Sequence, residues 1–244
     1  MTLAIGFQTA LAAVYPARCL SCGDVVDSDF GLCGPCWRDT AFIGGTVCDC
    51  CGLPLPGDGK GDALLCDGCL TAPRPWEKGR AAMLYRDTGR KLVLALKHGD
   101  RQEIAKPAAL WMAQTARGML RDDTLIAPIP LHWSRMISRR YNQSALLAHA
   151  LSKELDRESC ADLLLRPKRT VSLDGLTRTE RHDVVHNAIA VNPKRQDVAR
   201  GRPVLLVDDV MTSGATLSAA TQALQRAGAG PVCVVTLARV AKDT

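Results

Sequence analysis

Apolar and polar positions along the second half of the chain predict strands that alternate with helices. The clearest unit runs from "VLLVD" at 204–208 through "TLSAATQALQRAGAG" at 216–230 to "VCVVTLAR" at 232–239. This order is a strand, a helix that ends at Gly228, and a second strand. Both strands are apolar on each face, which is typical of a parallel sheet covered by helices on two sides. The pattern therefore predicts an α/β fold from about residue 81 onward.

Further elements are expected upstream of this unit. Apolar runs that read as short strands are "LVLAL" at 92–96, "TLIAPIPL" at 124–131 and "AIAV" at 188–191. The first of these would end as a strand at Lys97. Apolar residues recur at helical spacing over 102–120 and again over 142–155, where Asn142 is suited to cap the helix N-terminus.

Cysteines are concentrated near the N-terminus in pairs that predict metal binding. Nine of the eleven lie between Cys19 and Cys69, and eight of these form four C-x-x-C pairs: Cys19/Cys22, Cys33/Cys36, Cys48/Cys51 and Cys66/Cys69. Two such pairs supply the four sulfurs of one tetrahedral zinc site. A disulfide framework is the alternative, but no secretory signal is evident, and we expect a cytoplasmic chain with reduced thiols.

We expect the pairs to bind two zinc ions in chain order, the first four cysteines on one ion and the last four on the other. A cross-braced arrangement stays open at this stage. A site closed by four cysteines has no open position, so both zincs are predicted to be structural. Cys50 is expected to be a bystander, and Cys160 and Cys233 are expected to be ordinary buried thiols.

Two domains follow from this division of the chain. Residues 1–75 are predicted to form an N-terminal helix and a double zinc ribbon, and residues 81–244 the α/β domain. The segment "TAPRPWEKGR" at 71–80 is typical of a linker, because it holds two prolines and a glycine. The apolar stretch at 3–17 is interrupted by polar residues and is too short for a membrane span, so we expect no such span.

The net charge of +6 is unevenly distributed. Residues 131–202 contain 14 Lys and Arg against 8 Asp and Glu, while the rest of the chain is balanced. Such a basic segment can meet an anionic ligand, or it can be a solvated surface. Charge alone does not decide between these interpretations.

The strongest functional signal is "VLLVDDVMTSGATL" at 204–217, where a buried strand ends in two acids, Asp208 and Asp209. Charge at the end of a core strand is costly unless it is used. The strand leads into a helix N-terminus, where free amides and the helix dipole bind anions. The residues predicted to hold a phosphate are Thr212, Ser213, Gly214, Ala215 and Thr216. The two acids would meet ligand hydroxyls or a cation, and a ribose 5-phosphate with Mg²⁺ offers both.

These fourteen residues resemble the signature of type I phosphoribosyltransferases. The chain as a whole resembles the ComF family, named for a competence protein needed in DNA uptake. That resemblance is carried by the cysteine-rich head, "LVLALKHGD", "IAPIPLHWSRMISRRYNQSALLAHAL", the basic "LLRPKRT" and the phosphate-loop motif. Where the family usually shows Arg-Gly-Phe-Asn-Gln, this chain has "RRYNQ", so Arg140 stands in place of a glycine.

The resemblance implies a type I phosphoribosyltransferase fold, with a five-stranded parallel core flanked by helices. A partial hood would come from residues 81–125 and the zinc ribbons. Phosphoribosyl diphosphate, or a nucleotide, would place its 5-phosphate on 212–216 and its ribose hydroxyls on Asp208 and Asp209. Mg²⁺ would lie between ribose and diphosphate. Basic residues suited to stabilise the leaving diphosphate are Lys97, Arg135 and Arg139.

Two functions stay open. The first is an enzyme that transfers phosphoribose to an acceptor that the sequence does not name. The second is a non-catalytic protein that senses the ligand and contacts single-stranded DNA or a partner helicase through the zinc head and the basic middle segment. Aromatic residues that could stack on bases are few, and Tyr141 beside Arg139 is the one aromatic–basic cluster. Packing of that ring under the following helix is the favoured alternative.

Overall fold

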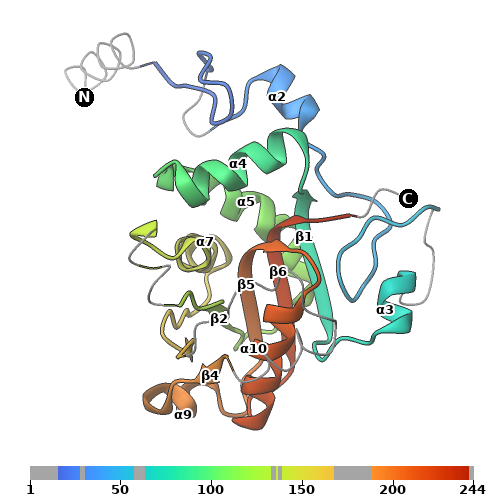
Figure 1. Cartoon of the computed structure of the whole chain (residues 1–244), viewed down its shortest axis with the longest axis vertical. Coiled ribbons are helices and arrows are strands. Elements are labelled where there is room, and N and C mark those ends of the chain that lie inside the picture. Colours follow the sequence, from blue (N-terminus) through green and yellow to red (C-terminus); the bar gives the residue numbers. More distant parts are fainter. Residues whose placement is uncertain are drawn as a thin grey trace, which may run out of the picture.

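A four-stranded parallel sheet forms the centre of the protein (Figure 1). The computed structural model describes residues 16–27, 31–57, 64–132, 136, 139–167 and 188–241. In spatial order the strands are β1 (Lys78–Leu84), β6 (Val232–Arg239), β5 (Val204–Met211) and β2 (Leu125–Pro128). A separate antiparallel pair joins β3 (Leu164–Leu165) to β4 (Ala190–Val191). The predicted strands at 124–131, 204–208 and 232–239 are confirmed.

Helices cover both faces of the sheet, as the apolar strands predicted. Their bounds are α4 (Asp87–His98), α5 (Ala105–Ala116), α7 (Gln143–Leu155), α9 (Gln196–Ala199) and α10 (Ala215–Arg226). Short 3-10 turns lie at Gln102–Ile104, Arg117–Met119 and Pro193–Arg195. Two small helices, α2 (Gly34–Asp39) and α3 (Asp67–Thr71), belong to the cysteine-rich segments.

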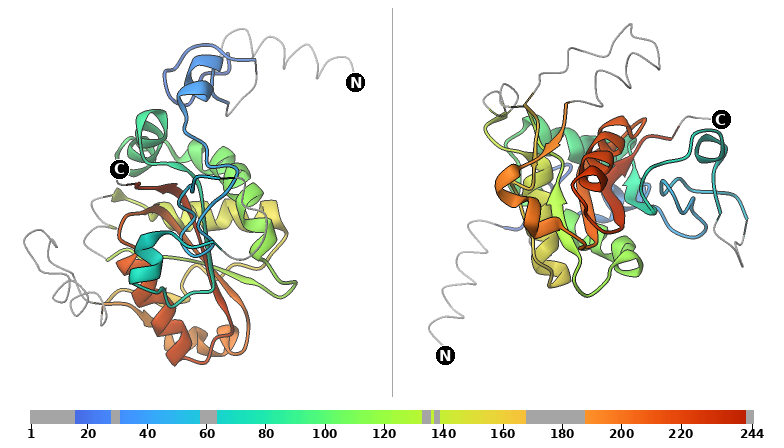
Figure 2. Two further views of the ribbon diagram at one scale, coloured as in Figure 1. Left: turned by 90° about the vertical axis from the view of Figure 1, so that its right-hand side faces the viewer. Right: turned by 90° about the horizontal axis from the view of Figure 1, so that it is seen from below.

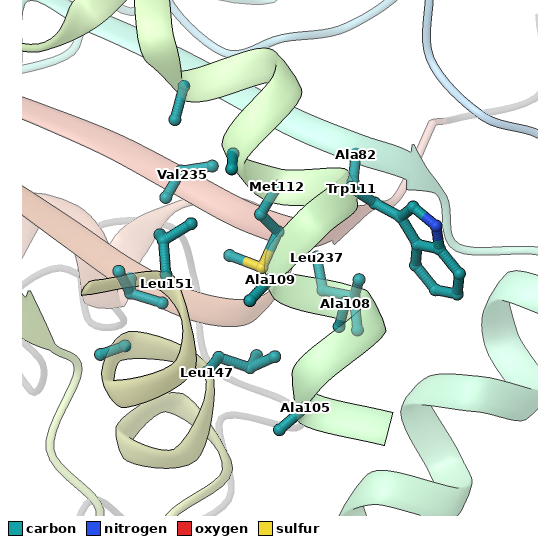
Figure 3. Close-up of a cluster of buried hydrophobic side chains, with 14 of the residues drawn as sticks. Ala82, Ala105, Ala108, Ala109, Trp111, Met112, Leu147, Leu151, Val235 and Leu237 are labelled. Atoms are coloured by element: carbon teal, nitrogen blue, oxygen red, sulfur yellow. The ribbon is translucent and has the colours of Figure 1, made fainter. Parts of the chain in front are cut away.

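One hydrophobic core lies between the sheet and helices α4, α5 and α7. Figure 3 shows α5 beside α7 on the same face of the sheet, with Met112 of α5 close to Leu151 of α7 and Val235 of β6. Small side chains on α5, such as Ala109, let the helix lie close to its neighbours, since each is almost wholly buried. The helical spacing predicted over 102–120 is thus confirmed.

The second core covers the opposite face of the sheet. Alternate residues of β5 divide between the two cores, Leu205 and Val207 to the first and Val204 and Leu206 to the second, as the two-residue period of a strand requires. Helix α10 packs on this second side through Leu217 and other apolar residues.

The two cysteine-rich segments lie at different places around the sheet, one beyond α4 and the other beside the edge strand β1 (Figures 1 and 2), and they contribute to different cores. The first, carrying α2, packs on α4, and Leu20 enters the first core. The second, carrying α3, lies beside β1, where the Gly79 amide donates to the Asp49 carbonyl at 2.9 Å, and its cysteines belong to the second core. Each ribbon therefore covers apolar surface of the α/β part of the chain.

Some expectations were wrong. The run at 92–96 is the end of helix α4, because Leu92, Val93 and Leu96 are buried together with Thr88 and Gly89, which is a helical period. The described residues form four strands in the main sheet, and a single parallel bridge between Ile126 and Ser159 stands where a fifth would lie. After this bridge the chain turns away to pair as β3.

The 81–125 region is less of a hood than expected. Most of β1 falls in it as an edge strand of the main sheet, and α5 lies in the first core, so only α4 spans the carboxyl edge. The segment 71–80 is also more ordered than a linker, because Trp76 is buried and β1 begins at Lys78. The predicted helix at 3–17 lies almost wholly outside the described residues. Within the described ranges, every helix is too short or too polar to cross a lipid bilayer.

Candidate functional site

The carboxyl end of β5 leads directly into a loop and the N-terminus of α10. Strand β5 ends at Met211 and the helix begins at Ala215, with Gly214 at the N-cap. Gly214 has φ +78°, and a Cβ on it would lie 3.1 Å from Cη2 of Trp76. Glycine is therefore required both by backbone conformation and by the packing of the loop. The twelve-residue helix directs the positive end of its dipole at this loop.

The two acids of the motif lie beside the loop. The Asp208 carboxylate accepts hydrogen bonds from Oγ of Ser144 at 2.8 Å and from the Asp209 amide at 2.9 Å. Burial, and then the charge of Asp209, raise the pKa of Asp208 to about 7, although the Ser144 hydroxyl and Lys97 act in the opposite direction. Asp208 is thus an acid whose ionisation is costly in the folded protein.

Lys97 reaches this pair of acids from the last turn of α4. Its ammonium lies 3.1 Å from Oδ1 of Asp209, and both side chains are largely buried. A lysine–carboxylate pair withdrawn from water is maintained only when the two charges compensate each other. The structure therefore brings together Lys97, Asp208 and Asp209, residues from two distant parts of the sequence.

The segment before α7 is tied to the same edge. The Arg139 guanidinium donates to Oε1 of Gln143 at 3.2 Å, and the Tyr141 hydroxyl donates to the Leu96 carbonyl at 2.7 Å. Tyr141 is only half-buried, and burial raises its pKa. This ring links α4 to the start of α7. Arg135 lies outside the described residues.

Two features predicted for this segment can be read from its backbone. Asn142 caps α7, since its side chain accepts from the Ser144 amide at 3.0 Å. Arg140 has φ +65°, in the left-handed region that favours glycine. This conformation explains why a glycine suits the position and why Arg140 carries backbone strain there.

Sequence reasoning missed several residues around the loop, Arg239 and Arg74 among them. Arg239 ends β6 and donates to the carbonyls of Met211 at 3.1 Å and Thr212 at 2.6 Å. Arg74 donates to the Ser213 carbonyl at 2.6 Å. The signal for Arg239 was present, because it is a charge at the end of an apolar strand, as Asp208 is. Arg74 had no signal within a segment read as a linker.

The eight paired cysteines form two clusters in chain order, which agrees with the predicted sequential pairing. In each cluster the four sulfur atoms lie within 4.8 Å of one another; the clusters are Cys19, Cys22, Cys33 and Cys36, and Cys48, Cys51, Cys66 and Cys69. The second cluster is wholly buried. A hydrogen bond from the Cys51 thiol lowers the pKa of Cys48, which favours the thiolate form that binds metal. Cys50 stays outside both clusters, Cys233 is buried and Cys160 is only half-buried.

A neighbouring arginine tests whether the second cluster fits a metal. Arg239 is 8% exposed, and Nη2 lies 3.9 Å from Sγ of Cys51. No carboxylate of the described residues forms an ion pair with it. A zinc held by four thiolates carries about two negative charges, which would balance this buried cation. The residues present therefore fit a structural zinc.

Comparison with known families matches both parts of the chain. A "Double zinc ribbon domain" model matches residues 10–70, and a "Phosphoribosyl transferase domain" model matches residues 142–244. The DNA utilization protein YhgH of Escherichia coli (strain K12) is 31% identical over 216 residues, covering 86% of this chain and 91% of the relative.

Two other similarities were found. Competence protein F of Haemophilus influenzae is 29% identical over 228 residues, covering 91% of this chain and 96% of that protein. Among solved structures, the glutamine phosphoribosylpyrophosphate amidotransferase from B. subtilis, complexed with ADP and GMP, aligns with a TM-score of 0.40 and 15% identity. That alignment covers 59% of this chain and 30% of the other.

Proposed function

Because the chain belongs to the ComF family, with a double zinc ribbon and a phosphoribosyltransferase domain, we propose that it binds phosphoribosyl diphosphate or a related ribose 5-phosphate with Mg²⁺. The ligand would lie at the carboxyl end of β5. We further propose a role in the uptake or use of DNA, next to the uptake machinery in the cytoplasm. Relatives named for competence and for DNA utilization support the link to DNA.

The observation that carries this proposal is the placement of two acids beside an anion-binding loop. In this arrangement the 5-phosphate binds the amides of 212–216, and the hydroxyls of Thr212, Ser213 and Thr216 add donors. The ribose hydroxyls donate to Asp208 and Asp209. The two aspartates and the loop amides together suit a ligand that has both sugar hydroxyls and a phosphate. A phosphate alone would be repelled by the acids.

The basic residues suit the diphosphate. Lys97 is already held at the site by Asp209, and Arg139 lies on the segment bonded to α4. Both can stabilise negative charge that develops as the bond from the anomeric carbon to diphosphate breaks. Mg²⁺ would be held by ligand oxygens with a carboxylate of Asp208 or Asp209, and it supplies charge neutralisation for the diphosphate.

Calorimetry tests the pocket directly. Phosphoribosyl diphosphate with Mg²⁺ should bind wild type, and the double variant Asp208→Asn, Asp209→Asn should bind at least about tenfold more weakly, as loss of hydrogen bonds to charged groups predicts. The chain provides a matched control in the adjacent acids Asp122 and Asp123, which precede β2 at the opposite end of the sheet. Their double asparagine variant should bind like wild type. Equal affinity for all three proteins would overturn the proposal.

A second candidate function, a ligand sensor that contacts single-stranded DNA, is favoured by one surface observation. Trp37 on α2 is 50% exposed, and its ring centroid lies 4.6 Å from that of Phe42. An exposed ring next to Arg38 can stack on a base. Binding of single-stranded DNA should fall steeply with salt and weaken in Trp37→Ala, but not in Leu70→Ala, an exposed residue on the second ribbon. No binding at low salt would contradict direct DNA contact.

An assay of diphosphate release from the same protein distinguishes catalysis from sensing. An enzyme releases diphosphate from phosphoribosyl diphosphate in the presence of an acceptor amine or base, and this release can be followed continuously. A sensor binds the ligand and returns it intact. Turnover lost in Lys97→Met even when the ligand concentration is raised until the variant is saturated would assign Lys97 to the leaving group.

A further inference from the structure

Arginine side chains hold three successive carbonyls of the phosphate loop. Nη1 of Arg239 donates to the carbonyls of Met211 and Thr212, and Nη1 of Arg74 donates to that of Ser213. The two arginines come from β6 and from the segment before β1, so they approach from outside the loop itself. The loop backbone is thus fixed by cations on one of its sides.

This arrangement sets the direction of the loop amides. In a trans peptide the N–H points opposite to the carbonyl of the preceding residue, and no described peptide bond is cis. The amides of Thr212, Ser213 and Gly214 therefore point away from the arginines. None of the three donates a hydrogen bond to another described residue. Successive amides left free on one side form an anion-binding concavity.

Both arginines are anchored on the second zinc ribbon. Arg239 approaches Sγ of Cys51 at 3.9 Å. The Arg74 guanidinium lies 5.7 Å from the ring centroid of Trp76, whose indole N–H donates to the Cys50 carbonyl at 2.6 Å. The ribbon therefore contacts the two residues that orient the loop.

The first ribbon has no such connection within the described part of the chain. It contacts the start of α4, where Asp39 accepts from the amide and the hydroxyl of Thr88 at 3.2 and 2.6 Å. That contact lies at the end of α4 remote from Lys97. The two ribbons thus differ in their relation to the phosphate loop, although their cysteine spacing is similar.

We propose that the second zinc ribbon is a positioning part of the phosphate site, and that zinc in this ribbon and the phosphoribosyl ligand strengthen each other's binding. The zinc-thiolate cluster holds Arg239, Arg239 and Arg74 hold the loop carbonyls, and the amides are thereby turned toward the phosphate. Zinc in the first ribbon does not take part. The inference rests on the proposed function, and the coupling is reciprocal because both ligands act on one equilibrium.

Alkylation of the cysteines, followed by mass spectrometry, measures zinc protection for each ribbon separately. Full-length zinc-loaded protein is treated with N-ethylmaleimide, with and without phosphoribosyl diphosphate and Mg²⁺. We expect the ligand to slow modification of Cys48, Cys51, Cys66 and Cys69 by about fivefold or more, the lower range of allosteric coupling. Modification of the first cluster should be unchanged. If calorimetry shows that the ligand binds, but alkylation is slowed equally in both ribbons or in neither, this inference is overturned while the proposed function stands.

Absence of ligand binding to wild type would instead overturn the proposed function, and the inference with it. Two arginines, Arg80 and Arg239, contact the second ribbon. Comparing their variants separates the positioning of the phosphate loop from the stability of the ribbon. Arg80 bonds the carbonyl and carboxylate of Asp49 on the ribbon, but not the loop. Arg80→Gln should speed alkylation of the second-ribbon cysteines. The factor by which the ligand slows that alkylation should stay the same as in wild type.

Arg239→Gln should lose the protection and bind ligand about tenfold more weakly, since two hydrogen bonds from a charged group are removed. If circular dichroism shows that this variant does not fold, Arg74→Gln takes its place, because Arg74 donates a hydrogen bond to the loop at the Ser213 carbonyl. Unchanged protection and affinity in a folded Arg239 or Arg74 variant would refute the positioning role.

Discussion

Replacing Asp208 by asparagine should stabilise the protein at alkaline pH while it removes ligand binding. The pKa of Asp208 is raised from its ordinary value of 3.8 to about 7, so the folded protein keeps a proton that the unfolded chain has released between these values. The free energy of unfolding therefore falls as pH rises through about 4 to 7 and stays low above that window. Asparagine is neutral throughout, and its side-chain oxygen can still accept from Ser144.

The size of the effect follows from the pKa difference. The complete pKa difference corresponds to a change of about 4 kcal/mol in the free energy of unfolding. Asp208 keeps partial contact with solvent, which roughly halves this to about 2 kcal/mol. Between pH 5 and pH 8 we therefore expect the stability of the variant to rise by about 1–2 kcal/mol relative to wild type, because most of the change falls within this range.

Urea unfolding of zinc-loaded protein at pH 5, 6.5 and 8 measures the difference, with zinc content determined at each pH. Asp209→Asn is the control, since it removes the partner of Lys97 and should destabilise the fold. An Asp208 variant less stable than wild type at pH 8, or a stability difference independent of pH, would show that burial of this carboxylate is not costly.

Three further perturbations are predicted. Asn142→Ala removes both the N-cap of α7 and a side-chain hydrogen bond to the preceding strand end, so unfolding in urea should show a loss of about 1–3 kcal/mol; a loss below about 0.5 kcal/mol would contradict the capping role. Lys97→Met should weaken binding of phosphoribosyl diphosphate with Mg²⁺ about tenfold in calorimetry, whereas the exposed Lys91→Met on the same helix should not. Gly79→Ala places a Cβ 2.4 Å from the Cys50 carbonyl, so the second ribbon should be displaced and mild chelation should remove its zinc faster; unchanged zinc retention would refute this packing argument.

The α/β core was predictable because its strands are apolar on both faces and its helices have clear periods. Periodicity failed at 92–96, where a short apolar run fits a strand as well as a helix, and burial of Thr88 and Gly89 decided for the helix. The position of β1 was missed because Lys78, Gly79 and Arg80 do not resemble a core strand. They tolerate that place since β1 is an edge strand next to the ribbon.

The candidate site was predictable where one motif contained it. Asp208, Asp209 and the loop are contiguous in sequence, and cysteine spacing gave both clusters. The contributions of Ser144, Arg74 and Arg239 depend on contacts between residues far apart in the chain, which no local pattern encodes. Lys97 was named through the family resemblance, but its ion pair with Asp209 became evident only from the packing of α4 across the sheet edge.

The strand order β1-β6-β5-β2 has a consequence for synthesis of the protein. Strand β6, which follows the other three strands of the sheet in the chain, inserts between β1 and β5, so β1 has no neighbouring strand in this sheet until β6 has been synthesised. A chain that stops before Val232 leaves two strand edges open and lacks Arg239. Termination before β6 should therefore yield an aggregation-prone product without a phosphate site, rather than a partly active fragment.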